Sequence, residues 1–349
     1  MRTTRAGTPF IVIGENIHAT RTVLRAGRHI VQTDDGREAV AFNDTAGAAR
    51  LLVVPDAVRE GGDFAAGKVK HVRAAILAGM GRDPAAADDG RAYLLQMAAR
   101  QVAAGADYID LNADEVSPDV DERAAAMRWL VGLVGAAIPV PVSVDSSAVE
   151  VIAAGVEAGA ALIGRPLINS ASLERLDVLD LAAAAGCPVV LGAVGEGGMP
   201  SGAEERVANG VRIVEEARKR GLALGQLHLD PLVIPVGVEP EAGTWYLDAA
   251  RGLRERFGSE IHLTGGLSNV SFGLPARKVI NDTFIDLAAE AGVDSGIIDP
   301  VVNDLARIFA QDRSSRPYEL AADILLGRDP YGGDYLAAFR AGELGGGAG

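Results

Sequence analysis

From residue 87 onward, short apolar runs alternate with longer segments in which apolar residues recur at helical spacing. Short apolar runs bounded by Gly, Pro, Asp or Asn are typical of buried strands, and the longer segments are typical of helices. With the run at 9–16 included, the predicted strands are 9–16, 108–113, 140–146, 161–170, 188–194, 227–235, 261–268 and 295–300. The predicted helices cover about 90–104, 120–136, 147–158, 172–185, 203–220, 243–256 and 277–292. This alternation predicts an α/β protein.

The same alternation predicts how the strands pair. A helix between two strands returns the chain to the same end of the sheet, so parallel pairing is expected. Eight strand–helix units predict a closed (β/α)8 TIM barrel, for which a chain of 349 residues is ordinary. An open doubly wound sheet is the alternative fold. It is disfavoured because the dinucleotide fingerprint G-x-G-x-x-G does not follow the first strand.

Residues 20–75 interrupt this rhythm. The stretch "RHIVQTDDGREAVAFND" alternates apolar and polar residues around Asp-Asp-Gly-Arg, which indicates a β-hairpin, and "LLVVP" is expected to pair with it. We interpret the segment as a small β-rich insertion between the first strand and the first barrel helix, either near the active site or as a loop without a role there. After residue 313, "YELAADILLG" and "DYLAAFRAG" predict extra C-terminal helices. Residues 1–340 are expected to form one domain, followed by a disordered Gly-rich tail at 341–349.

Composition narrows the possible partners of the chain. It is 48% hydrophobic and carries a net charge of −14 without a basic patch, so neither nucleic acid nor an anionic membrane is an expected partner. The N-terminus has only five consecutive apolar residues and predicts neither a signal peptide nor a spanning helix. The one cysteine, Cys187, lies in an apolar run and cannot form an internal disulfide, which fits a reducing cytoplasm.

Polar side chains stand where the predicted strands end, which in a parallel barrel is the end that carries the chemistry. The set comprises Glu15, Asn16, Asp110, Asn112, Asp145, Ser146, Asn169, Ser170, Asp230, Ser268, Asn269 and Asp299. Helix capping is the competing interpretation of each, because Asp, Asn and Ser are favoured N-caps. Ser146 or Ser147 is expected to cap the helix predicted at 147–158, which leaves Asp145 available for another role. Capping is a poor account of Asp230, since the next helix begins about ten residues later.

Several common chemistries have no counterpart in this set. The sequence contains no nucleophile elbow, no C-x-x-C or H-E-x-x-H metal motif and no G-x-x-x-x-G-K-[ST] phosphate loop. The five histidines are scattered, and His228 and His262 are expected in the barrel interior or facing helices. A barrel whose strand ends are rich in carboxylates and amides suits a neutral, flat ligand with many N–H donors. A pterin is such a ligand, and many other heterocycles also qualify.

Six motifs at or near these strand ends form a recognisable set. They are "IGENI", "GADYIDLN", "SVDSS", "INSAS", "DPLVIPV" and "GLSNVSFGLPARKVINDTF". Together they resemble the methyltetrahydrofolate:corrinoid protein methyltransferases. These belong to the pterin-binding barrel superfamily, which also contains dihydropteroate synthase and the folate domain of cobalamin-dependent methionine synthase. The resemblance covers residues 8–19 and about 90–312. It implies methyl transfer between N5 of methyltetrahydrofolate and the cobalt of a corrinoid (cobalamin) carried by a partner protein.

The resemblance also implies roles for individual residues. Asp145, Asn169 and Asp230 match residues that hold the pterin ring. Asn269 matches the asparagine that hydrogen-bonds N5 and is the expected catalytic residue. The other positions expected at the substrate are Arg277, Asp110, Asn112 and Glu15.

The chain also departs from the family pattern in three places. Asn16 and His18 stand where the family has a different polar pair, and "VGEGGMP" replaces a more typical loop. These two departures concern the second substrate or the pterin tail. The segment 20–75 is absent from compact family members, so its role stays open.

The chemistry explains why an amide could serve as the catalytic group. Methyl transfer from N5 requires a proton or a strong hydrogen bond at that nitrogen, because an amine anion is a very poor leaving group. Small residues around Asn269, including Gly265 and Gly266, would allow close approach to the ring. The corrinoid is itself the nucleophile, so this chain needs none. As in the family, a homodimer is expected.

Two other functions remain open. A dihydropteroate synthase-like condensation would need basic residues after Asp230, and "DPLVIPVG" has none. A non-catalytic folate-binding subunit of a corrinoid complex is the other alternative, against which the intact Asn269 argues.

Overall fold

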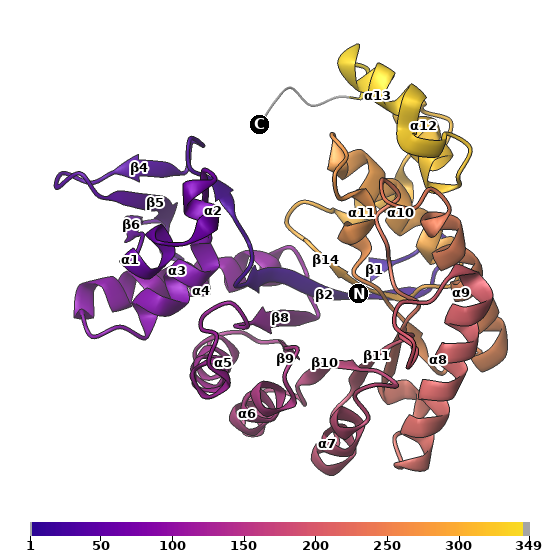
Figure 1. The fold of residues 1–349 in the computed structure, drawn as a ribbon, viewed down its shortest axis with the longest axis horizontal. Helices are drawn as coiled ribbons and strands as arrows, with labels where there is room; N and C mark the ends of the chain where they lie inside the picture. Colours follow the sequence, from indigo (N-terminus) through magenta and orange to yellow (C-terminus); the bar gives the residue numbers. More distant parts are fainter. Residues whose placement is uncertain (1, 345–349) are drawn as a thin grey trace. The chain divides into compact units, whose positions relative to one another are not determined.

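The computed structural model describes residues 2–344, so residues 345–349 of the predicted tail lie outside the described residues. The chain divides into two compact units. The N-proximal unit is Gly14–Asn169, and the C-proximal unit is Met1–Ile13 with Ser170–Gly349. Each of the eight predicted strand runs contains an observed strand, which confirms the α/β class (Figure 1). Closure into a (β/α)8 barrel and the single domain over 1–340 stay predictions.

Strands of the N-proximal unit bring polar ends into register. The neighbouring strands are, in order, β2 (Pro9–His18, which begins in the other unit), β8 (Tyr108–Asn112), β9 (Val142–Asp145) and β10 (Leu167–Ala171). Asn112 pairs opposite Asp145, and Asp145 pairs opposite Asn169, with parallel strand directions. The helices between these strands are α4 (Pro84–Ala103), α5 (Val120–Gly135) and α6 (Val149–Gly159), and α5 and α6 lie side by side (Figure 1). Parallel pairing is therefore confirmed for β8, β9 and β10.

Residues 20–75 contain the predicted β-structure. β4 (Ile30–Gln32) and β5 (Glu38–Asn43) form the predicted hairpin, and Gly36 in its turn has a φ of 79°. The stretch "LLVVP" contributes to β6 (Ala49–Val53), which pairs with β5 as expected. The remaining elements are β3 (Val23–Leu24), its antiparallel partner β7 (Lys68–Val69), α1 (Asp56–Arg59), α2 (Gly62–Ala65) and α3 (His71–Gly79). The sequence pattern did not predict α3, because no strand separates it from α4.

The C-proximal unit contains the later strands. The parallel neighbours are β11 (Val189–Gly192), β12 (Leu227–Asp230) and β13 (His262–Leu263). β14 (Ser295–Ile298) pairs with β2, and β1 (Arg2–Thr3) pairs with β2 in the antiparallel sense. The helices predicted among them are α7 (Asp177–Ala185), α8 (Gly202–Lys219), α9 (Ala242–Phe257) and α10 (Arg277–Glu290).

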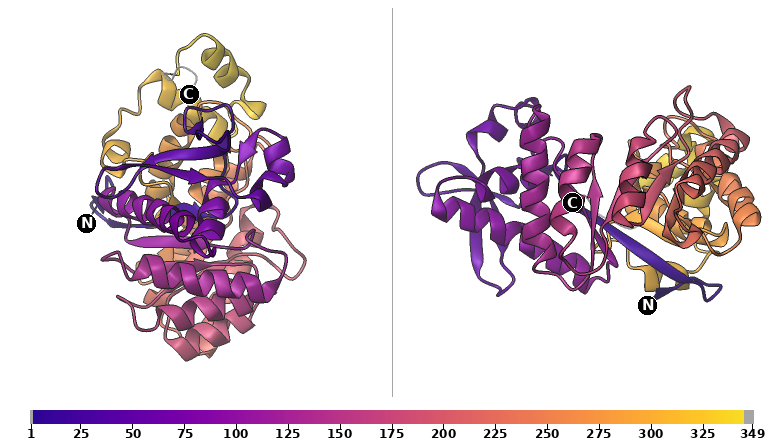
Figure 2. Two further views of the ribbon diagram at one scale, coloured as in Figure 1. Left: turned by 90° about the vertical axis from the view of Figure 1, so that its left-hand side faces the viewer. Right: turned by 90° about the horizontal axis from the view of Figure 1, so that it is seen from below.

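Two further helices lie after residue 313, as predicted. They are α12 (Arg316–Leu325) and α13 (Gly333–Arg340), the two neighbouring yellow helices in Figures 1 and 2. The sequence pattern did not predict α11 (Leu305–Ala310) or the single 3-10 turns η1 (Leu224–Gln226) and η3 (Pro330–Gly332). These elements are too short to show a hydrophobic period.

Three predicted strands are too long, each for a local reason. The run 161–170 contains Gly164 and Pro166, and β10 begins only after them. The run 227–235 contains Pro231, which has no N–H to donate, and β12 ends directly before it. The run 261–268 contains two adjacent glycines. There β13 ends at Leu263, and Leu267–Ser271 form the 3-10 helix η2.

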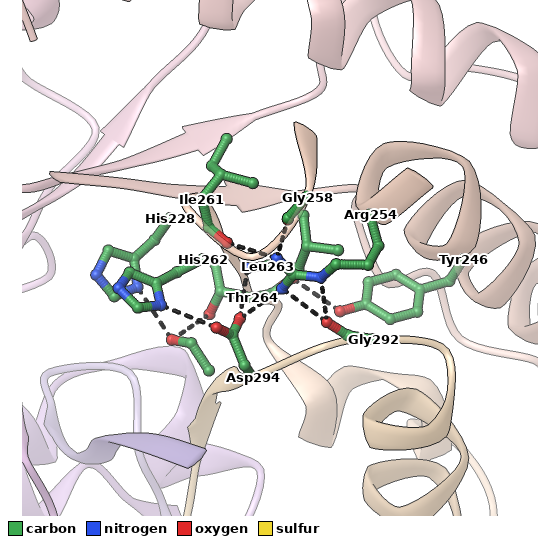
Figure 3. A network of polar contacts seen from close by, with 11 residues as sticks. His228, Tyr246, Arg254, Gly258, Ile261, His262, Leu263, Thr264, Gly292 and Asp294 are labelled. Atoms are coloured by element: carbon green, nitrogen blue, oxygen red, sulfur yellow. Dashed lines mark hydrogen bonds and ion pairs between the residues drawn. The ribbon is translucent and has the colours of Figure 1, made fainter. Parts of the chain in front are cut away.

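A polar network holds the start of β13 and of β14 against α9 (Figure 3). Arg254 donates to the carbonyl oxygens of Gly258, Ile261 and Gly292 and to the carboxylate of Asp294. Asp294 also accepts the backbone N–H of Leu263 at 2.8 Å. One guanidinium and one carboxylate thus tie two strand starts to the end of a helix.

Two histidines meet in the same region. The rings of His228 and His262 stack with centroids 4.7 Å apart. His228 is buried, as expected for an interior residue, and its Nδ1 lies 3.0 Å from Ser295 Oγ. His262 is half-buried, and its Nδ1 lies 3.0 Å from Asp294 Oδ2. Burial lowers the pKa of His228 to about 3, so this ring is neutral at pH 7.

Two expectations from composition can be compared with the structure. Cys187 is buried shortly before β11, as its apolar surroundings predicted. Within residues 2–344, no helix has the length and apolar character needed to cross a membrane.

Candidate functional site

Asp145, at the end of β9, is the centre of a polar cluster in the N-proximal unit. Its Oδ2 accepts a hydrogen bond from Asn112 Nδ2 at 3.0 Å and lies 3.3 Å from His18 Nε2. Among the described residues, its Oδ1 has no hydrogen-bond partner. The strand register explains the contact between Asn112 and Asp145, because the two residues stand opposite each other on β8 and β9. One carboxylate oxygen is held in place and the other is available.

His18 is a site residue that the sequence pattern did not single out as part of this cluster. Thr20 donates its backbone N–H to His18 Nδ1 at 3.3 Å, so Nε2 is the nitrogen that carries a proton toward Asp145. Burial alone would lower the pKa of His18. The hydrogen bond to Asp145 and the charges of Asp145, Asp110 and Glu15 raise it above its ordinary value. Its place on the same strand face as Asn16, two residues away, is the signal that could have found it.

Asp110 lies in β8, buried beneath this cluster. Its Oδ1 accepts hydrogen bonds from Ser143 Oγ at 2.5 Å and from Asn169 Nδ2 at 3.4 Å. Burial raises the pKa of Asp110 to about 7, and the charge of Asp145 acts in the same direction. A carboxyl group that titrates near neutral pH can accept or supply a proton there. The structure thus brings Asp110, Asn112, Asp145 and Asn169 together at neighbouring strands.

The expected capping of α6 by Ser146 or Ser147 is wrong. The N-cap residue of α6 is Ala148, which has no side chain able to cap. Both serine hydroxyls instead donate to the carboxylate of Asp114, which also accepts the backbone N–H of Ser147 at 2.8 Å. The sequence pattern missed Asp114, which fixes the turn that follows Asp145.

Glu15 and Asn16, near the end of β2, share one cationic partner. Arg21 donates to Asn16 Oδ1 at 2.7 Å and to Glu15 Oε1 at 3.4 Å. The strand also lies tightly on α4, because Gln101 Oε1 accepts the Asn16 N–H at 3.0 Å. A Cβ atom at Gly14 would come within 2.5 Å of that same oxygen, so a larger residue there would displace the Gln101 side chain from this hydrogen bond. Glu15 is thus positioned by Arg21, a residue that the sequence analysis did not name.

Asp230 ends β12 in the C-proximal unit. Its Oδ1 accepts the backbone N–H of Leu232 at 2.7 Å, and Leu232 has a φ of 73°, a conformation that side-chain-bearing residues seldom adopt. Burial raises the pKa of Asp230 to about 7, although the N–H groups of Leu232 and Gly266 and the charge of Arg206 favour the ionised form. The carboxyl group is therefore held by a strained turn rather than by a helix, and it does not cap α9.

Asn269 lies within η2, and its side chain makes no hydrogen bond among the described residues. Helix α10 begins eight residues later, at Arg277, with Ala276 as its N-cap, so Asn269 does not cap it. A Cβ atom at Gly266 would lie 2.8 Å from Asn269 Nδ2, which makes that glycine necessary for the present side-chain position. The Asn269 amide is thus half-buried, has no hydrogen-bond partner among the described residues and lies close to the main chain of Gly266.

Arg277 braces the segment that carries Asn269. Its Nε donates to Ser271 Oγ at 3.0 Å and its second terminal nitrogen donates to the Ser268 carbonyl at 2.8 Å. The guanidinium also lies 4.3 Å from the ring centroid of Phe272. Arg277 therefore holds the backbone on both sides of Asn269.

The predicted residues consequently fall into two sets. Glu15, Asp110, Asn112, Asp145 and Asn169 lie in the N-proximal unit, and Asp230, Asn269 and Arg277 lie in the C-proximal unit. Within residues 2–344, no three His, Cys, Asp or Glu side chains are placed to hold a metal ion. Both sets offer carboxylate acceptors and amides, the groups that match the mixed donor and acceptor edges of a pterin.

The pterin-binding enzyme family model matches residues 87–299, the part of the chain that contains most of these carboxylates and amides. The chain belongs to this family. It is 33% identical to the methylcorrinoid:tetrahydrofolate methyltransferase of Eubacterium limosum over 261 residues, which cover 73% of this chain and 89% of that protein. The predicted family resemblance is thus confirmed.

Two further comparisons show another similar sequence and a protein with a similar fold. The methionine synthase of Mycobacterium leprae is 31% identical over 219 residues, which cover 58% of this chain and 18% of that much longer protein. The dihydropteroate synthase of Xanthomonas albilineans has a similar structure, with a TM-score of 0.52 and 20% identity over 76% of this chain and 94% of that one. At this identity the structural similarity shows a common fold only.

Proposed function

We propose that the protein transfers a methyl group between N5 of methyltetrahydrofolate and the cobalt of a corrinoid held by a partner protein. The observation that carries the proposal is the in-register cluster of Asn112, Asp145 and Asn169 above the buried Asp110. A relative named for methyl transfer between a methylcorrinoid and tetrahydrofolate shares 33% of the aligned residues and supports it.

The carboxylates of both units suit the amino-pyrimidinone edge of the folate. Adjacent N–H groups of that edge can be accepted by a carboxylate, and the available Oδ1 of Asp145 is such an acceptor. Asp230, whose carboxyl group is held by the turn at Leu232, would accept in the same way. The amide of Asn169 could donate a hydrogen bond to an acceptor of the pterin ring or accept one from a donor. We propose that folate-binding residues are present in each set, as the family resemblance implies.

The transfer breaks the C–N5 bond and forms a bond from the methyl carbon to cobalt, and N5 must take up a proton. Asn269 supports the developing charge on N5, since its amide has no other hydrogen bond among the described residues. Arg277 positions Asn269 by holding the Ser268 carbonyl and the Ser271 hydroxyl. No residue of this chain acts as a nucleophile, because the corrinoid supplies the electron pair.

The complete proposal includes a closed (β/α)8 barrel with residues 20–75 as an insertion after its first strand. It also includes a cytoplasmic location, supported by the single buried Cys187, and a homodimer, supported by the family resemblance. Dihydropteroate synthase activity is disfavoured because residues 231–238 contain no lysine or arginine that could bind a departing diphosphate.

Folate titration tests the site assignment. Replacing Asp145 or Asp230 by Ala should weaken methyltetrahydrofolate binding by roughly 1.5–3 kcal/mol, the range for hydrogen bonds to charged groups. Asp248→Ala, which removes an exposed carboxylate of α9, is the matched control and should bind normally. Unchanged affinity in both site variants would exclude these carboxylates from the folate site.

A further inference from the structure

The segment 20–75 and helix α4 enclose a groove of about 790 Å³ within the N-proximal unit. We call it the α4 groove. It is lined chiefly by Val40, Phe42, Leu51, His71, Tyr93 and Arg100. Its volume lies in the range of small-molecule sites. The folate proposal uses none of these six residues.

The groove follows one face of α4. Tyr93, Gln96, Met97 and Arg100 all line it, and their spacing of three, four and seven residues places them in one stripe along the helix. Seven residues of helix rise by about 10 Å, which separates the Tyr93 end from the Arg100 end. The groove therefore has two distinct ends, and a ligand that touches both must be elongated.

A buried hydrogen-bonding pair forms one end. The hydroxyl of Tyr93 lies 2.9 Å from His71 Nδ1, and both side chains are less than 10% exposed. His71 Nε2 has no hydrogen-bond partner among the described residues. Burial lowers the pKa of His71 to about 4, so the ring is neutral and Nε2 offers one N–H or one lone pair. A hydroxyl group of a ligand can accept a hydrogen bond from this N–H or donate one to this lone pair.

A cation forms the other end. Arg100 is exposed and has no ion pair among residues 2–344. The second arginine of the lining, Arg50, is already engaged by Asp88 and Asp89. Among the described residues no Asp or Glu lines the groove, although the chain as a whole carries a net charge of −14. An anionic group is therefore matched to this end, and the guanidinium favours a planar carboxylate.

The wall between the two ends is apolar. Phe42 meets Tyr93 edge-on with ring centroids 5.0 Å apart, and Leu51 is 38% exposed into solvent. Val40 and Met97 continue this surface. An apolar body about 10 Å long would cover these side chains and remove them from water.

From this arrangement we propose that the α4 groove binds an elongated carboxylic acid with an apolar, preferably aromatic, body and a hydroxyl group at its far end. The carboxylate pairs with Arg100, the body lies on Phe42 and Leu51, and the hydroxyl bonds His71 Nε2. The proposal is independent of the folate assignment and gives the segment 20–75 a function of its own.

Calorimetric titration with 4-(4-hydroxyphenyl)butanoate tests the proposal, and two close analogues separate its parts. The uncharged 4-(4-hydroxyphenyl)butanamide lacks the carboxylate, and 4-phenylbutanoate lacks the hydroxyl. The full-length protein should bind the hydroxy acid one to one and more tightly than either analogue. Arg100→Gln should weaken the hydroxy acid about 10-fold or more and leave the amide unchanged. His71→Phe should remove the preference for the hydroxylated acid over 4-phenylbutanoate.

Two controls accompany these variants. Arg91→Gln removes the same charge from α4 outside the groove and should bind as the parent protein does. Melting temperatures establish that each variant is folded. His71→Asn, which keeps a hydrogen-bonding group for Tyr93 but lacks Nε2, replaces His71→Phe if the latter is not folded. Equal affinity for the acid and the amide, or no effect of Arg100→Gln, would overturn the proposal. So would self-association that Leu51→Ser abolishes, because the groove would then cover a second copy of the chain.

Discussion

The amide of Asn269 is half-buried, makes no hydrogen bond among the described residues and lies against the main chain of Gly266. A polar side chain used for structure would normally have a partner at such a position. Its neighbour Arg277 by contrast makes two hydrogen bonds to the same segment. The arginine shapes the segment, and the asparagine is left for a ligand.

Asn269→Ala should therefore reduce methyl transfer far more than it reduces stability. One lost donor aimed at the transition state commonly costs about 10²–10³ in rate. The free energy of unfolding should change by less than about 0.5 kcal/mol, because the side chain has no hydrogen bond to lose. Single-turnover transfer and thermal unfolding of the same sample measure both. Normal turnover with a lowered melting temperature would reverse the assignment and make Asn269 structural.

Asp110 should make stability depend on pH in a defined direction. Its pKa of about 7 in the folded protein exceeds its usual 3.8, so the folded state binds more protons between these values. The free energy of unfolding contributed by this group must then fall as the pH rises from about 4 to about 7. Asp110→Asn has no proton to lose and escapes this fall.

Urea unfolding at several pH values checks this prediction. The stability of Asp110→Asn relative to the parent should increase from pH 5 to pH 7 and change little above that. Asp114→Asn is a matched control, since Asp114 accepts its hydrogen bonds from serine hydroxyls and a backbone N–H of the next strand end. If the stability difference between Asp110→Asn and the parent protein does not vary with pH, the pKa of Asp110 is not raised in the folded protein.

At the scale of elements, the network around Asp294 connects the starts of β13 and β14 to α9 (Figure 3). The hydrogen bonds from His262 and the Leu263 N–H and the charge of Arg254 outweigh burial and lower the pKa of Asp294. Asp294→Asn keeps the shape and removes the charge. The free energy of unfolding should decrease by about 1.5–3 kcal/mol, while folate binding per folded molecule stays normal.

Chemical denaturation of Asp294→Asn measures this decrease. Asp248→Asn is the control, because Asp248 pairs with Arg251 on the exposed face of the same helix and such pairs contribute little. Equal stability of the two variants would mean that the network is replaceable by water.

The elements themselves were largely predictable from the sequence. Apolar period and flanking residues indicated β8, β9, β11 and β14 closely, because burial on parallel strands leaves a continuous apolar run. The ends were less predictable. Gly265 and Gly266 interrupt β13, and Pro231 ends β12, although the apolar runs continue past them. The short helices α1, α2 and α11 are set by tertiary packing and have no period to detect.

For the site, the sequence indicated the acidic and amide residues but not their partners. The strand-end rule singled out Asn112, Asp145 and Asn169, and the structure shows them on neighbouring strands in register. It did not reveal that His18 contacts Asp145 or that Arg21 holds Glu15 and Asn16, because these contacts depend on strand pairing and on side-chain direction. The hydroxyls of Ser146 and Ser147 hydrogen-bond Asp114 and do not cap α6. Local propensity alone does not predict which of these two hydrogen-bonding arrangements forms.

At the scale of the whole molecule, the residues proposed to bind folate are distributed over both units. The N-proximal unit supplies Asp145 with its two fixed donors, and the C-proximal unit supplies Asp230 and Asn269. Binding of the folate should therefore depend on carboxylates of both units, whereas the rate should depend chiefly on Asn269. The segment 20–75 adds a separate groove and is not needed for this division.

Methyl transfer itself is the most direct test. Methyltetrahydrofolate and free cob(I)alamin are mixed with the protein in a stopped-flow spectrometer without oxygen, and the absorbance of cob(I)alamin is followed. The account predicts a protein-dependent loss of that absorbance, saturable in folate and slowed about 10²–10³-fold in Asn269→Ala. The same experiment with a corrinoid protein as acceptor should be faster, since the natural partner positions the cobalt. Tight folate binding without any loss of the cob(I)alamin or corrinoid-protein signal would contradict the account and leave a folate-binding protein that is not a methyltransferase.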